Sequence, residues 1–180
     1  APLVIALRNN HSDIARLLIE QGVDINVHDK NSLTALHIAS EKGHSEVVQL
    51  LIERGVVFEK ESKKGWTALH FASQKGHANI AKLLIEQGAD VSKQNKRRNA
   101  PLHWASQEGH LAVARLLIEH GADLNMKNDN SSPALVIALQ CGHPDIAGFL
   151  IEQGADINVQ DEGGRAPLHI ASEKGHSEVV

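Results

Sequence analysis

Twelve histidines in a chain of 180 residues are the first candidates for metal or acid–base chemistry. Ten of them form two series whose members lie 33 residues, or a multiple of 33, apart: His11, His44, His77, His110, His143 and His176, and His37, His70, His103 and His169. Only His28 and His120 lie outside these series. A zinc site needs about four ligands that converge on one point, whereas the members of each series lie one repeat apart. The spacing therefore predicts neither a metal site nor a cofactor.

Sequence signatures of an enzyme are also missing. There is no G-x-x-x-x-G-K-[ST], no H-E-x-x-H and no G-x-S-x-G, and the scattered Ser, His and Asp show no spacing typical of a triad. The single cysteine, Cys141, can form neither an internal disulfide nor a thiolate pair, and we interpret it as a neutral surface or half-buried residue. We predict no catalytic residue in this chain, although a flanking domain of a longer protein could be catalytic.

Composition narrows the function classes further. Apolar residues make up 42% of the chain, enough for a substantial core. The formal net charge of −4 makes nucleic acid an unfavoured partner. No apolar run approaches the roughly 18 residues that a membrane helix needs, so we predict no membrane insertion. A single cysteine and the lack of a signal peptide favour an intracellular protein, cytoplasmic or nuclear.

The chain is a series of 33-residue repeats without gaps. Residues 67–73 (TALHFAS) are echoed by residues 100–106 (APLHWAS), and residues 83–90 by residues 116–123. The predicted units are 1–33, 34–66, 67–99, 100–132, 133–165 and a partial sixth, 166–180. We expect one array over residues 1–180, and we expect it to be a fragment of a longer array because Val180 falls inside a predicted second helix.

Each unit encodes two short helices and a loop. Thr67 is a plausible N-cap, and Gly76 provides the left-handed conformation that ends the first helix. A broad apolar stripe that includes Leu84 predicts the second helix, and about eleven polar residues form an extended loop after Gly88. Helices this short are marginal alone, so stacking must bury their stripes. The expected fold is an all-α repeat solenoid.

The units resemble ankyrin repeats, since they match the T-P-L-H-x-A-A opening, the G-H link and the L-L-L-x-x-G-A-D-V-N segment over the whole chain. The resemblance implies a helix-turn-helix with a projecting β-hairpin or loop, in a slightly curved stack with a concave groove that binds proteins. It also implies that the two histidine series hydrogen-bond turns and neighbouring repeats. Three asparagines of the hairpin segment could be hydroxylated in such repeats, or serve only as turn residues: Asn26, Asn125 and Asn158.

The repeats differ from one another most in their central loops. Lys63, Lys64, Lys96, Arg97 and Arg98 are predicted to form one basic patch on adjacent loops, and Arg98 stands where glycine is expected. Nearby lie Asn99 and three aromatic residues, Trp66, Phe71 and Trp104. Aromatic and Arg residues are frequent interface anchors, so these nine residues are the predicted site for an acidic or amphipathic protein segment. The alternative is that the charges are a solvated face and that Phe71 and Trp104 are mainly core.

A longer period of four repeats is also present, because the first unit resembles the fifth and the second resembles the sixth. In the first and fifth units, Val4 and Val136 replace the motif His, and Leu7 and Leu139 replace a small Ser. We interpret these leucines as packing residues rather than as apolar spots on the concave side.

The predicted function is a protein-interaction scaffold or adaptor, and we favour a monomer. The alternative is an accessory targeting or regulatory segment of a larger enzyme, channel or signalling protein.

Overall fold

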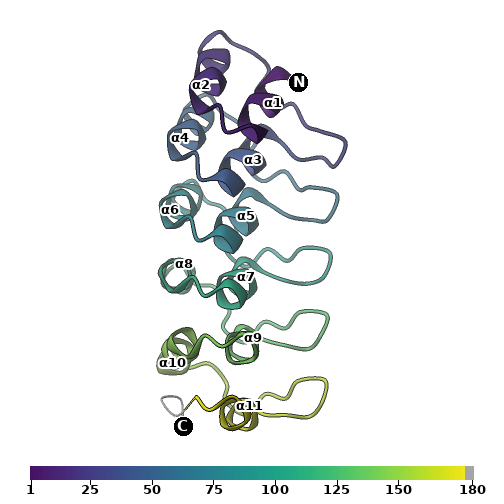
Figure 1. The fold of residues 1–180 in the computed structure, drawn as a ribbon, viewed down its shortest axis with the longest axis vertical. Helices are drawn as coiled ribbons and strands as arrows, with labels where there is room; N and C mark the ends of the chain where they lie inside the picture. The colour runs from purple at the N-terminus through teal and green to yellow at the C-terminus, as the bar shows by residue number, and fades with distance from the viewer. Residues whose placement is uncertain (177–180) are drawn as a thin grey trace. The chain divides into compact units, whose positions relative to one another are not determined.

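The computed structural model describes residues 1–176, and this range is helical without a named strand (Figure 1). The helices are α1 (Pro2–Arg8), α2 (Ser12–Glu20), α3 (Ala35–Lys42), α4 (Ser45–Glu53), α5 (Ala68–Lys75), α6 (Ala78–Glu86), α7 (Pro101–Glu108), α8 (Leu111–Glu119), α9 (Ala134–Cys141), α10 (Pro144–Glu152) and α11 (Pro167–Lys174). The prediction of an all-α repeat solenoid is confirmed. The predicted helix around Val180 lies outside the described residues.

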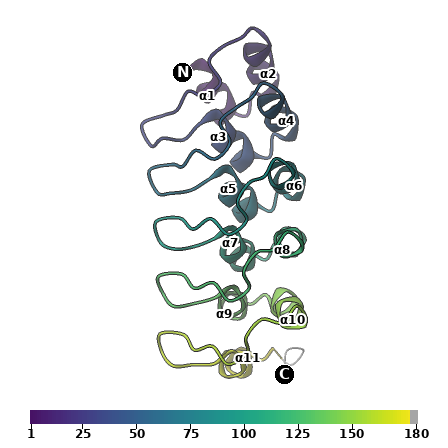
Figure 2. The same cartoon turned by 180° about the vertical axis from the view of Figure 1, so that it is seen from behind.

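The helices pack as two compact units, Ala1–Asp90 and Val91–Val180, which we call the N-terminal half and the C-terminal half. In the N-terminal half α1, α3 and α5 form one row, α2, α4 and α6 form a second, and each first helix packs on its own second helix. The C-terminal half repeats this plan, with α7, α9 and α11 in one row and α8 and α10 in the other. In each half the loops project beyond the row of first helices (Figures 1 and 2).

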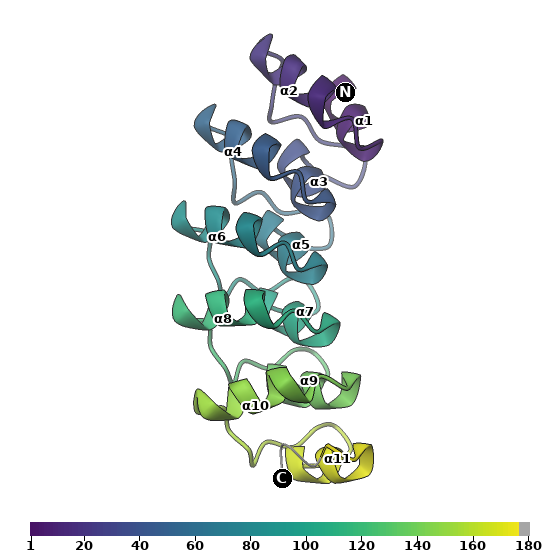
Figure 3. The same ribbon diagram turned by 60° about the vertical axis from the view of Figure 1, so that its left-hand side comes forward.

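Leucines at equivalent positions build the core of both halves. Leu69 and Leu102 in first helices, and Leu84 and Leu117 in second helices, are all at most 1% exposed. Leu7 and Leu139 are fully buried, which confirms their interpretation as packing residues. The pairing of a first and a second helix, from α1 with α2 to α9 with α10, is visible from the side in Figure 3. Burial of this stripe, rather than the helix propensity of nine-residue segments, stabilises the helices.

The first helices end where the sequence predicts. Thr67 is the N-cap of α5, and Gly76 follows α5 with a φ of +73°. After α1, Asn10 takes the place of this glycine and adopts a φ of +60°. Asparagine is the residue that best replaces glycine in this region of backbone space, so the local signals and the structure agree.

The projecting segments are loops rather than strand-paired hairpins. Within residues 1–176 the only bridge outside the helices is an isolated antiparallel one between His28 and Thr34. A side chain organises each turn instead, because it accepts the backbone N–H groups two and four residues later. For example, Asn95 Oδ1 accepts from Arg97 N–H at 2.9 Å and from Asn99 N–H at 3.0 Å. The acceptors at this position are Asp29, Ser62, Asn95, Asn128 and Asp161.

Two glycines at equivalent helix ends allow a test of how closely the repeats pack in the C-terminal half. Gly109 and Gly142 follow α7 and α9 with φ values of +79° and +81°. A Cβ built on Gly109 would lie 2.6 Å from Cε1 of His143, whereas a Cβ on Gly142 would meet nothing within 4 Å. The His143 ring is held in place, because its Nε2 donates to the carbonyl of Gln107 at 3.0 Å.

We therefore expect Gly109→Ala to destabilise the protein more than Gly142→Ala does. Both variants force alanine into a left-handed conformation, which costs about 1–2 kcal/mol. Gly109→Ala adds an overlap with imidazole, for which overpacking predicts a further ~1–3 kcal/mol. Chemical denaturation of both variants measures the difference, and His143→Ala in the Gly109→Ala background should remove it. Equal destabilisation by the two single variants would contradict the expected contact.

Candidate protein-binding surface

In the four repeats that have an opening histidine, its ring bonds the backbone at the start of the first helix. Thr34 N–H donates to His37 Nδ1 at 2.9 Å, and His37 Nε2 lies 2.9 Å from the carbonyl oxygen of Lys60. A ring nitrogen that accepts an N–H carries no proton, so His37 is the Nε2–H tautomer and donates to Lys60. His70, His103 and His169 receive the same backbone bond through Nδ1, and His103 Nε2 lies 2.9 Å from the Met126 carbonyl.

Burial favours the neutral imidazole at His37 and His103. It lowers the pKa of His37 to about 4, although hydrogen bonds to the backbone oppose this shift. Burial also lowers the pKa of His103. Histidines of the G-H link make a second kind of bond, to the preceding repeat: His77 Nε2 to the carbonyl of Glu41 at 3.2 Å, and His143 Nε2 to that of Gln107 at 3.0 Å. The structural roles that the resemblance implies are therefore observed.

No group of three or more His, Cys, Asp or Glu side chains in residues 1–176 is arranged to hold a metal ion. Cys141 is free, and burial together with the carboxylate of Glu108 raises the pKa of its thiol. A thiol with a raised pKa is a poorer nucleophile at neutral pH.

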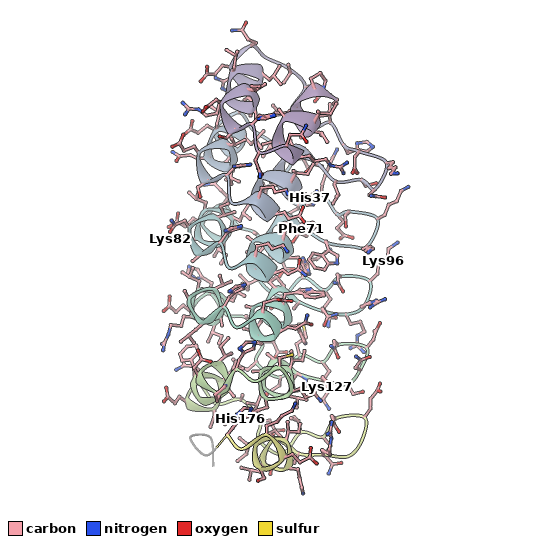
Figure 4. All side chains as sticks on the ribbon, in the orientation of Figure 1. His37, Phe71, Lys82, Lys96, Lys127 and His176 are labelled. Atoms are coloured by element: carbon pink, nitrogen blue, oxygen red, sulfur yellow. The ribbon has the colours of Figure 1, made fainter. Side chains whose placement is uncertain are left out.

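Four of the predicted binding residues line one groove in the N-terminal half. The groove has a volume of about 490 Å³, and its lining includes Lys63, Lys64, Trp66 and Phe71. The rings of Trp66 and Phe71 lie 4.8 Å apart between centroids, and both side chains are partly exposed. Phe71 also meets His37 edge to face, with 5.6 Å between ring centroids (Figure 4). Phe71 is therefore neither a purely core residue nor a fully solvated one.

Sequence reasoning missed four further residues of this groove: Asn31, Leu33, Ser62 and Gln74. Asn31 and Leu33 belong to the first loop, at the positions that Lys64 and Trp66 occupy in the second. The 33-residue alignment could have identified them, because equivalent positions of adjacent loops lie side by side. Their contact is direct, since Lys63 N–H donates to the carbonyl of Asn31 at 3.0 Å.

The other predicted binding residues belong to the C-terminal half. Lys96, Arg97 and Arg98 are exposed on the third loop, from which Lys96 extends away from the helices in Figure 4. Asn99 is partly buried, because its Oδ1 accepts from Asn128 Nδ2 at 2.9 Å, and Trp104 is partly buried on α7. The five cations thus divide between the two halves, and a single basic patch stays a prediction.

Comparison with known proteins identifies the architecture. A family model described as "Ankyrin repeats (3 copies)" matches residues 3–95, 56–128 and 102–180.

The chain belongs to the ankyrin repeat family.

A second comparison finds RP714 of Rickettsia prowazekii (strain Madrid E), which is named as an ankyrin repeat protein and is 48% identical over 40 residues. This match covers 22% of the present chain and 37% of the relative's length. Ankyrin repeats are in general protein-interaction modules, and the family is typically non-catalytic. No helix in residues 1–176 combines the length and the apolar character needed to cross a membrane.

The three asparagines of the ankyrin hairpin segment share one local geometry. The backbone N–H groups of Asn26, Asn125 and Asn158 each donate to the carboxylate of the Asp two residues before, at 2.8–2.9 Å. The Asn26 amide oxygen also accepts from Val57 N–H at 3.0 Å, and that of Asn125 accepts from Asp156 N–H at 2.9 Å. The amide oxygens of Asn26 and Asn125 thus link the segments of adjacent repeats. Hydroxylation of the three side chains stays a prediction.

Proposed function

We propose that this ankyrin array is a scaffold or adaptor that binds an acidic or amphipathic segment of another protein through its loops and first helices. The observation that carries the proposal is the groove of the N-terminal half, where two partly exposed aromatic rings lie beside two lysines. Support for a reducing compartment, cytoplasm or nucleus, comes from the single free cysteine.

The aromatic pair provides the apolar part of the groove. Trp66 and Phe71 come from different elements, the end of the second loop and the middle of α5, and their rings are tilted by 42°. Tryptophan and other large rigid side chains supply most of the binding free energy at many interfaces. A groove of about 490 Å³ accommodates an apolar side chain of a partner and the backbone beside it.

The charges around the groove favour a partner that carries an acidic residue next to the apolar side chain in the groove. Lys63 and Lys64 are exposed at its rim, and none of its lining residues within the described part of the chain is acidic. Complementary charge speeds association and selects among partners more than it strengthens the final complex. The favoured ligand is therefore a peptide with an apolar residue close to Asp or Glu.

Hydrogen bonds hold the rim in place before a partner arrives. Ser62 Oγ accepts from Lys64 N–H at 3.3 Å and from Trp66 N–H at 3.1 Å. The bond from Lys63 N–H to Asn31 ties the second loop to the first. A preorganised loop loses little conformational entropy on binding, which supports direct recognition by these backbone segments.

A displayed library of random 15-residue peptides, selected on the intact chain, tests this proposal. We expect enriched peptides to combine an apolar residue with Asp or Glu. Their affinity should fall about tenfold or more in Trp66→Leu/Phe71→Ile, since truncated anchor residues cost ~2 kcal/mol or more. These replacements are the residues at the equivalent positions of the preceding repeat, Leu33 and Ile38, so the fold should tolerate them.

Reversing the charge of the two lysines at the rim is the second part of this experiment. Lys63→Glu/Lys64→Glu should slow association and reduce its dependence on salt. Selected peptides that lack acidic residues, or that bind both double variants with the affinity of the original chain, would refute the proposal.

A further inference from the structure

The third loop, in the C-terminal half, presents three consecutive exposed cations, Lys96, Arg97 and Arg98. Within residues 1–176 none of the three forms an ion pair. The three side chains are exposed to solvent, where an anionic ligand can reach them.

Arg98 also has an unfavourable backbone conformation. Its φ is +56°, in the left-handed region, where a side chain with a Cβ is disfavoured. Gly65 and Gly164 occupy the equivalent place in the second and fifth loops, and the small residues Ser32 and Ser131 occupy it in the first and fourth. Arg98 is thus the one bulky residue at this position in the five loops of residues 1–176.

The turn itself enforces the conformation. Arg98 N–H donates to the carbonyl of Asn95 at 2.9 Å, and the Arg98 carbonyl accepts from Gln94 Nε2 at 2.7 Å. Local strain persists only where surrounding bonds determine the backbone in this way, and it is frequent at functional sites. The position therefore keeps its geometry whichever residue it carries.

Contacts with the fourth loop fix the backbone under all three cations. Asp129 N–H donates to the Arg97 carbonyl at 3.2 Å, and Gln94 Nε2 also donates to the carbonyl of Lys127 at 3.1 Å. The backbone N–H and carbonyl groups of Arg97 and Arg98 are bonded within the protein, so the groups that these two residues offer to a ligand are their side chains. Guanidinium groups bind the paired oxygens of carboxylates and phosphates with two parallel hydrogen bonds.

We infer that Arg98 is a specificity-determining residue, which anchors a cluster of anionic oxygens on a peptide bound at the third loop. The inference rests on the proposed function of peptide binding and concerns the C-terminal half by itself. A peptide suits the loop better than a nucleic acid does, because the next loop offers an exposed acid, Asp129, and the chain has a net charge of −4. A nucleic acid would require a longer basic surface.

The test compares Arg98→Gly with Ser131→Gly, both of which place glycine at a left-handed position of the C-terminal half. Each should raise the midpoint of thermal unfolding by about 2–4 °C, because each relieves the same backbone strain. The probes are an octaglutamate peptide, a peptide with four phosphoserines, an uncharged octaglutamine peptide and the DNA strand dT8. Binding is followed by NMR of the isotope-labelled full chain.

We expect the two anionic peptides to shift the amides of Arg97 and Arg98, and octaglutamine to leave them unchanged. The relative affinities of the two anionic peptides distinguish carboxylate from phosphate as the preferred source. Arg98→Gly should weaken their binding about threefold to tenfold and reduce its salt dependence, whereas Ser131→Gly should retain the affinity. Arg98→Lys should retain the salt dependence but only part of the affinity, because an ammonium group cannot form the two parallel hydrogen bonds of a guanidinium group.

Equal affinity of Arg98→Gly and the original chain, or tighter binding of dT8 than of either peptide, would overturn the inference. Failure of the groove proposal has a different signature. In that case selected peptides would leave the signals of Trp66 and Phe71 unchanged, while the amides of the third loop still respond to octaglutamate.

Discussion

Replacing His37 with valine is expected to lower the free energy of unfolding by about 3 kcal/mol, because it leaves two backbone groups without their partner. The Thr34 N–H and the Lys60 carbonyl both bond the imidazole, and Thr34 is only 2% exposed. Steric misfit does not account for this loss. Val4 and Val136 occupy the same position in the first and fifth repeats, where they are at most 4% exposed.

The fifth repeat shows why valine is tolerated at the position of His37. Its N-cap is Pro133, which has no N–H, so no donor requires the imidazole there. The backbone of Thr34, with φ −82° and ψ 170°, matches that of Pro133, with φ −78° and ψ 170°. We therefore expect Thr34→Pro/His37→Val to be more stable than His37→Val by about 1–2 kcal/mol, the cost of one buried unsatisfied N–H.

Urea denaturation of the two single variants and the double variant measures this coupling as a double-mutant cycle. Thr34→Pro alone should be destabilising, because it removes the donor to His37 and the Thr34 hydroxyl that accepts from His37 N–H. If the changes in unfolding free energy of the two substitutions are additive, the valine does not depend on the proline, and the pairing of Pro133 with Val136 has no energetic basis.

The helices of this fold can be predicted from the sequence, because their signals are local. Apolar spacing marks the second helices, and the left-handed residue after each first helix is a glycine or, after α1, Asn10. The Pro133–Val136 pairing is equally visible in the sequence, but its meaning depends on the bond between the N-cap amide and Nδ1. Only the geometry of His37 or His70 reveals that bond.

The candidate site is harder to predict, because its residues act through contacts between loops. Asp29, Ser62 and Asn95 look variable in an alignment of the repeats, yet each accepts the amides of its own turn. The groove likewise depends on Trp66 and Phe71 meeting across two elements. The sequence identified the cations and placed Arg98 where glycine is expected, but only the structure shows that this arginine keeps a positive φ of 56°.

Acid should destabilise the folded chain well above the pH at which carboxylates titrate. An unfolded histidine has a pKa near 6.5, whereas burial lowers the pKa of folded His37 to about 4 and also lowers that of His103. Above pH 6.5 neither state binds the proton, and the contribution of the neutral, buried rings to stability is complete. As pH falls from about 6.5 toward 4, the unfolded chain takes up protons that the folded chain does not, so stability decreases.

The expected loss is large for one residue. Each unit of pKa difference corresponds to 1.36 kcal/mol, so His37 alone accounts for about 3 kcal/mol between pH 6.5 and pH 4. Unfolding free energies measured from pH 8 to pH 4.5 should therefore decline, with His103 adding to the slope. Thr34→Pro/His37→Val serves as the matched variant, since it removes the imidazole and the N–H that requires it. The unfolding free energy of this variant should depend less steeply on pH. Near pH 5 the slope should be smaller by up to about 1.4 kcal/mol per pH unit, which corresponds to one proton fewer taken up on unfolding. Parallel curves for the two proteins would mean that folded His37 binds its proton as readily as the unfolded chain does, which is incompatible with the Nδ1 bond from Thr34.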